Sequence, residues 1–105
     1  MSVPLYTEML NGVKGVEDVH KMFTEFYAGE KFIKVMSLDA EAGVGNMLAG
    51  NAGSGWDGLR IFVTGNEDRI VLSSQFDNLG KGASGAAIQC LNIMLGCAED
   101  KGLNL

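Results

Sequence analysis

The sequence predicts an α/β protein of the α+β type: one mixed, mostly antiparallel sheet of about four strands, with two helices on one face. Three observations predict it. The chain has 105 residues, enough for one domain, and 47% of them are apolar, which is typical of a chain with a hydrophobic core. Segments with strand and helix periodicity follow in the order β-α-β-loop-β-β-α. Elements in this order pack as a single sheet covered by its helices.

The first part of the chain is predicted to form a strand, a helix and a second strand. Residues 3–10 mix β-branched, aromatic and leucine side chains in near alternation, and Asn11-Gly12 closes this strand. A helix begins at Val16 and stops at Gly29, and its apolar residues recur at helical spacing: Val16, Val19, Phe23, Phe26 and Tyr27. Residues 31–38 form the next strand, which is apolar on both faces apart from its lysines.

The second part begins with a stretch, residues 39–57, that has no periodicity and is rich in glycine. So long a segment in a small domain indicates a binding loop or a disordered segment. Residues 59–64 and 69–76 are predicted strands joined by a turn at residues 65–68. The last helix covers residues 83–95, with an apolar side that would face the sheet: Ala83, Ala87, Cys90, Leu91 and Met94. The opposite sheet face must then meet solvent, a partner subunit or another domain, and the apolar strand at residues 31–38 favours a partner.

Charge and cysteine content exclude several function classes. Thirteen acidic against eight basic residues give a net charge of −5, which argues against binding to nucleic acid or to an anionic membrane surface. No segment resembles a membrane span or a signal peptide. If Cys90 and Cys97 lie on one helix, their spacing of seven positions makes them too distant for a disulfide, and no residues have metal-ligand spacing. A reduced, cytoplasmic protein without a metal site is predicted.

Two segments match the pattern Gly-x-Gly-x-x-Gly, and neither is a dinucleotide-binding fingerprint. Residues 53–58 lead into a strand, and the helix that residues 80–85 open is followed by no further strand. The second segment can still act in one of two ways. Unpaired N–H groups of its first turn, with Lys81 and Ser84, could bind an anion or a cofactor edge. Alternatively, its small residues allow the helix to pack closely against the sheet.

Other candidate residues do not assemble into an active site. His20 is the only histidine, and its charged helical neighbours indicate a solvated position. Trp56, in the glycine-rich stretch, can cover the core or offer a stacking surface. No pair of carboxylates is spaced for acid–base catalysis, and no cysteine or serine can be joined to a histidine. No catalytic residue is therefore predicted in this chain.

Residues 77–96 (DNLGKGASGAAIQCLNIMLG) closely resemble the C-terminal signature of the N-acetyl-γ-glutamyl-phosphate reductase family. The family pattern is matched at four places: Asn78-Leu79, Lys81-Gly82-Ala83, residues 85–89 and residues 92–96. Three further segments match the family more loosely: VPLYTEML, KFIKV and LRIFVTGNEDRIVL. The likeness covers nearly the whole chain, although Gly55-Trp56-Asp57 stands where the family has a Gly-Thr-Asn-like element.

The resemblance implies that residues 1–105 form one domain, a fragment of a catalytic and dimerisation domain like that of glyceraldehyde-3-phosphate dehydrogenase. A Rossmann NADP-binding domain, and the catalytic cysteine and histidine, would lie in sequence that precedes Val3. The resemblance places Asn78 and the turn Lys81-Gly82-Ala83 against the nicotinamide end of NADP. With Ser84 at the helix start, these are the predicted cofactor-binding residues. It implies a homo-oligomeric parent enzyme of arginine biosynthesis with a small-molecule substrate, and a chain that is inactive alone. The alternative is a free-standing, non-catalytic α+β binding or assembly module.

Overall fold

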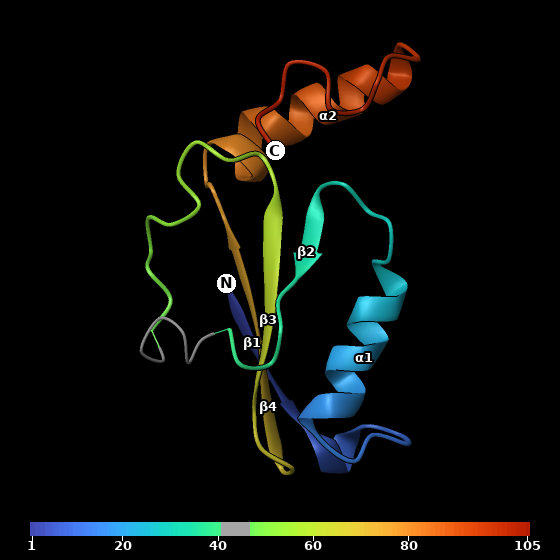
Figure 1. The fold of residues 1–105 in the computed structure, drawn as a ribbon, viewed down its shortest axis with the longest axis vertical. Helices are drawn as coiled ribbons and strands as arrows, with labels where there is room; N and C mark the ends of the chain where they lie inside the picture. Colours follow the sequence, from blue (N-terminus) through green and yellow to red (C-terminus); the bar gives the residue numbers. More distant parts are fainter. Residues whose placement is uncertain (41–46) are drawn as a thin grey trace.

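A single twisted sheet organises the molecule (Figure 1). The structure is a computed structural model that describes residues 1–40 and 47–105. Within them the strands are β1 (Ser2–Tyr6), β2 (Ile33–Val35), β3 (Leu59–Gly65) and β4 (Arg69–Phe76), in the sheet order β1-β4-β3-β2. β4 is antiparallel to both of its neighbours, whereas β2 is parallel to β3. With helices α1 (Val16–Phe26) and α2 (Gly85–Met94), this confirms the predicted α+β fold.

The hairpin of β3 and β4 agrees with its prediction, and the other two strands are shorter than predicted. β1 ends at Tyr6, after which residues 7–9 form a 3₁₀ turn whose Thr7 N–H donates to Asp68 O at 3.2 Å. β2 keeps three residues because only these pair with β3. β2 and β3 are parallel, and parallel strands need a long connection, which accounts for the number of residues between Val35 and Leu59. Part of that stretch, residues 41–46, lies outside the described residues.

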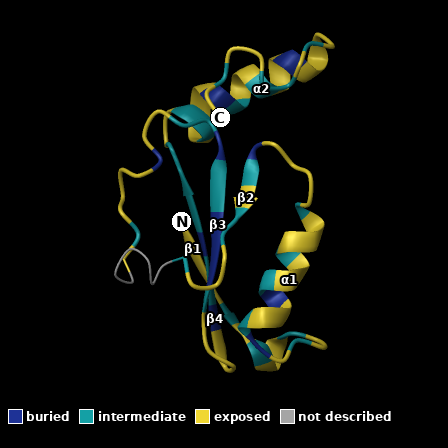
Figure 2. Ribbon diagram, in the orientation of Figure 1, coloured by how far each residue is buried: buried dark blue, intermediate teal, exposed yellow. Residues whose placement is uncertain are grey.

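Helix α1 packs on one face of the sheet and encloses the core (Figure 2). Val19 is 1% exposed and contacts a cluster of Ile61, Val63 and Ile70 from β3 and β4. These strand residues share a face because alternate side chains of a strand point the same way. The predicted helix is therefore confirmed, except that Phe26 is 76% exposed and does not belong to the core face.

The second sheet face is partly covered by the chain itself, through residues 47–57. The Arg60 guanidinium donates to Ala52 O at 3.3 Å, and the Gln75 amide donates to Ala49 O at 2.8 Å. Phe62, two residues beyond Arg60 on the same face, is 6% exposed. The glycine-rich stretch thus protects a surface that the sequence had assigned to solvent, a partner or another domain.

Helix α2 departs from its predicted position on the face of the sheet. It lies beyond the ends of the strands, across the end where β4 leads into it (Figure 1). Gly85 and Asn92 are its buried residues, whereas the predicted core side is exposed: Ala83, Ala87, Cys90, Leu91 and Met94. The reason is that Asn92 donates to Glu99 O and Lys101 O, so that the C-terminal segment, not the sheet, covers this helix. No helix in the described residues is long and apolar enough to cross a membrane.

Candidate functional site

The turn between β4 and α2, which contains the predicted cofactor-binding residues, is built on Asp77. One carboxylate oxygen accepts the Leu79 N–H at 3.0 Å, and the other accepts the Gly55 N–H at 2.7 Å. The backbone oxygen of Asp77 accepts the Gly82 N–H at 2.9 Å. Hydrogen bonds from the N–H groups of Leu79 and then Gly55 lower the pKa of Asp77 below its usual 3.8, so the carboxylate stays ionised at neutral pH. Asp77 therefore joins the glycine-rich stretch to the start of α2.

Close packing surrounds two glycines of residues 80–85, Gly80 and Gly85. A Cβ at Gly85 would lie 2.8 Å from the backbone carbonyl of Gly80 and would also clash with the Asp57 carboxylate. A Cβ at Gly80 would lie 2.7 Å from the same carboxylate. Residues 80–84 form a π-helical turn that leads directly into α2. Of the two roles left open by the sequence, tight packing is thus the one that the geometry explains.

The five predicted residues do not converge on one cavity. Asn78 is exposed and lines a cavity beside β4. The Lys81 ammonium lies over the Phe32 ring, 4.8 Å from its centroid, and donates to the Gln89 amide oxygen. Ser84 Oγ donates to Leu79 O at 2.7 Å.

The backbone of the same turn also differs from its prediction. The N–H groups of this turn were predicted to be unpaired, but that of Gly82 is bonded to Asp77 O because the turn is π-helical, with bonds between residues five apart. Ala83 lies exposed in this turn. Lys81, Gly82 and Ser84 thus already have partners within the chain, which leaves the amide of Asn78 as the accessible polar group.

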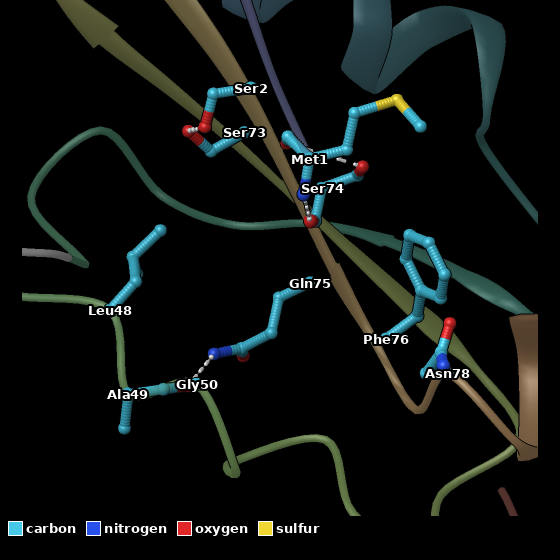
Figure 3. A pocket seen from close by; sticks show the side chains of 10 residues that line it. All are labelled: Met1, Ser2, Leu48, Ala49, Gly50, Ser73, Ser74, Gln75, Phe76 and Asn78. Carbon is cyan, nitrogen blue, oxygen red and sulfur yellow. Dashed lines mark hydrogen bonds between the residues drawn. The ribbon is translucent and has the colours of Figure 1, made fainter.

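The cavity beside Asn78 has a volume of about 330 Å³ (Figure 3). Its walls come from segments far apart in the sequence: the start of β1, residues 48–50, and residues 73–76 of β4. Ser2 Oγ and Ser73 Oγ are 2.9 Å apart, and Gln75 spans to Ala49 O. Half of the lining residues are polar, and Phe76 is the aromatic one, next to Asn78.

Sequence reasoning missed the strand residues of this cavity, Ser73, Ser74 and Gln75. The signal was present as three consecutive polar residues in β4, after the apolar run Ile70–Leu72 and three residues before Asn78. Polar residues in the interior of a sheet need partners or a solvent-filled space, and here they have both.

The remaining candidates have structural roles. His20 on α1 lies 2.9 Å from Met36 O through Nε2, and Cys90 is exposed on α2, a different element of the fold. The Trp56 ring packs under the Arg60 guanidinium, whose carbon lies 4.5 Å from the ring centroid. Lys34 approaches the same ring at 5.6 Å. Trp56 therefore lies on the second face of the sheet, against these two cations, and not over the core that α1 encloses.

The sequence of this chain matches curated proteins of known name. No protein-family model matches the chain. Curated proteins from Brucella ovis, Brucella canis and Brucella abortus are each 42% identical to it over 98 residues. All three are named N-acetyl-γ-glutamyl-phosphate reductase. The chain is a homologue of part of these reductases.

The extent of the match is unequal. It covers 91% of this chain but 31% of the Brucella ovis N-acetyl-γ-glutamyl-phosphate reductase, so the chain spans about a third of its relatives' length. The resemblance predicted from the sequence is confirmed, and the match is consistent with a C-terminal part of the reductase. By their name the relatives are reductases of N-acetyl-γ-glutamyl phosphate.

Proposed function

We propose that this chain is the C-terminal segment of an N-acetyl-γ-glutamyl-phosphate reductase. The whole enzyme converts the acyl phosphate into the semialdehyde and phosphate, with NADPH as the hydride donor. The observation that carries the proposal is the 42% identity, which extends over 91% of the chain. The catalytic cysteine would come from the two thirds of the relatives that the chain does not match. This chain then supplies part of the scaffold and is inactive alone.

The residues present fit one end of the cofactor. Asn78 offers an exposed amide next to Phe76 and a cavity of about 330 Å³, which suits the carboxamide and ring of a nicotinamide. The cofactor's phosphate groups find no free donors in this turn, because the Lys81 ammonium already donates to Gln89 and the Gly82 N–H to Asp77 O. Asn78 is thus proposed to orient the nicotinamide, and the phosphates would be bound by the part of the enzyme outside the match.

The sheet is proposed to form the dimer interface through the part of its second face that residues 47–57 leave open. Pro4 on β1 pairs with Val71 on β4, which pairs with Thr64 on β3, so the three form one row across that face. Pro4 is exposed, and the other two are half-buried. A row of small side chains on an open sheet face suits packing against a second sheet.

A chimera tests the proposed function. In it, this chain replaces the homologous third of the Brucella ovis reductase, and phosphate-dependent reduction of NADP by N-acetylglutamate semialdehyde is measured. The proposal predicts reductase activity in the chimera and none in this chain alone. The matched control is the Brucella protein with the same third deleted. A chimera with native-like circular dichroism and no activity would contradict the proposal, as would activity of this chain alone.

A further inference from the structure

The turn that carries Asn78 lies at the surface of the molecule. Asn78 and Leu79 are both exposed, Leu79 at 73%, and the π-helical turn that follows, residues 80–84, contains no buried residue. An exposed segment with few buried apolar contacts opens easily unless hydrogen bonds hold it. The orientation of the Asn78 side chain therefore depends on the hydrogen bonds made by its neighbours.

Asp77 supplies hydrogen bonds that hold Asn78 in place. Its carboxylate accepts the N–H of Leu79, on the other side of Asn78, at 3.0 Å, and the N–H of Gly55 at 2.7 Å. The first bond closes the backbone around Asn78, and the second ties the closed turn to the glycine-rich stretch. Hydrogen bonds to an ionised acceptor are roughly twice as strong as those between neutral groups. The Asp77 carboxylate thus restrains the backbone on both sides of Asn78.

Gly55 is held in turn by the C-terminal segment, which lies against the chain as it enters β3 (Figure 1). The side-chain amide of Asn104 donates to Gly55 O. The Asn104 backbone donates its N–H to the Asp57 carboxylate at 2.9 Å and accepts the Asp57 N–H at 2.7 Å. Hydrogen bonds therefore connect Asn104 through Gly55 to Asp77, the residue that precedes Asn78.

We propose that Asp77 is a positioning residue for Asn78, and that the Asn104 amide supports it through Gly55. The inference rests on the proposed function, in which the Asn78 amide orients the nicotinamide. A misplacement of about 1 Å in a group that orients a reactant can slow the reaction by about 100-fold. Fixing the turn before the cofactor binds avoids that loss. Asp77 contributes without touching the cofactor, because it acts on the residue that does.

A double-mutant cycle in the chimera with the Brucella ovis protein tests this role. Hydride transfer is measured by single-turnover absorbance for Asp77→Ala, for Asn78→Ala and for the double variant. Asp77→Ala should slow hydride transfer at least about ten-fold, because it releases a group that orients the cofactor. It should cause no further slowing once residue 78 is alanine, since the effects of residues that act through one another are not additive. A merely structural role of Asp77 would slow both backgrounds alike.

Asn104→Ala is the milder second variant, because it removes the bond to Gly55 O and leaves both backbone bonds to Asp57 in place. It should slow hydride transfer less than Asp77→Ala does, and again only while Asn78 is present. Asp18→Ala is the matched control. The Asp18 carboxylate also accepts a backbone N–H, that of Lys14 at 2.8 Å, but it belongs to α1, which does not line the Asn78 cavity. It should leave hydride transfer unchanged.

The mobility of Asn78 in this chain alone gives a readout that needs no enzymatic activity. The NMR order parameter of the Asn78 backbone N–H should be about 0.85, the value of rigid backbone, and should fall below about 0.6 in Asp77→Ala. Asp18→Ala should leave the order parameter at the parent value.

The outcomes separate this inference from the proposed function. An active chimera in which Asp77→Ala has no effect, or the same effect in both backgrounds, would overturn the inference and leave the proposed function standing. An inactive chimera with native-like circular dichroism would contradict the proposed function, and the order parameter would then decide the inference. A fall in Asp77→Ala would support the restraint of Asn78 by Asp77, whereas an unchanged value would overturn it.

Discussion

Replacing Gly85 by alanine should destabilise the chain, although alanine is the better helix former. The substitution gains about 1 kcal/mol in helix propensity. Against this, the new Cβ would lie 2.8 Å from the carbonyl carbon and oxygen of Gly80, and closer still to the Asp57 carboxylate. Overpacking of this kind costs about 1–3 kcal/mol, and here the cost falls at the upper end because the Gly80 backbone cannot rotate away. The expected net loss is about 1–2 kcal/mol.

Urea unfolding of the chain, followed by circular dichroism, measures this loss. Gly50→Ala is the matched control, because nothing lies within 4 Å of a Cβ at Gly50 and its φ is not positive. It should leave the free energy of unfolding unchanged or raise it by up to about 1 kcal/mol. If Gly85→Ala were as stable as the parent chain, residues 80–85 would not be closely packed, and a binding role for their small side chains would regain support.

Three further predictions concern pH, the core and association. The pKa of Asp77 is lowered in the folded state, so the ionised carboxylate stabilises the fold above pH 3.8, the pKa in the unfolded chain, and this stabilisation is lost as the pH falls below that value. Asp77→Asn should therefore make the free energy of unfolding in urea less sensitive to acid. Ile70→Ala, at a position that is 0% exposed, should lower the free energy of unfolding by about 2–5 kcal/mol. Met9→Ala, at a position that is 77% exposed, should lower it by less than about 0.5 kcal/mol. Sedimentation equilibrium at high micromolar concentration should give a mass above the 11.1 kDa of the monomer.

Each of these has a result that would contradict it. An Asp77→Asn chain with the parent's acid sensitivity would show that its hydrogen bonds to Leu79 and Gly55 do not stabilise the turn. Equal losses for the substitutions at Ile70 and Met9 would contradict the position of the core. A homogeneous monomer would contradict the proposed dimer interface on the second face of the sheet.

The sequence predicted the β3–β4 hairpin well because its signals are local. Alternating apolar residues flank a polar turn, in which Asn66 Oδ1 accepts the N–H groups of Asp68 and Arg69 at 3.0 and 2.9 Å. The extent of β2 was harder to predict, since three of its residues pair with β3 and the apolar flanks do not. Pairing is a tertiary property that composition does not reveal.

Helix α2 shows the limit of periodicity. The apolar stripe through Cys90, Leu91 and Met94 was identified correctly, but a hydrophobic pattern says which residues share a side and not what that side contacts. Here that side does not pack on the sheet, and its residues are exposed. The Asn78 cavity was unpredictable for a related reason. Its walls come from residues 1–2, 48–50 and 73–78, which only the folded sheet brings together.

The most direct test of the account is the contribution of Asn78 to the reductase chimera. Asn78→Ala should weaken NADP binding or slow hydride transfer, measured by equilibrium titration and by single-turnover absorbance, because the exposed amide is proposed to orient the nicotinamide. His20→Ala, on a helix that does not line the Asn78 cavity, should alter neither quantity. If Asn78→Ala leaves both NADP affinity and hydride transfer unchanged, this chain does not form a wall of the cofactor pocket.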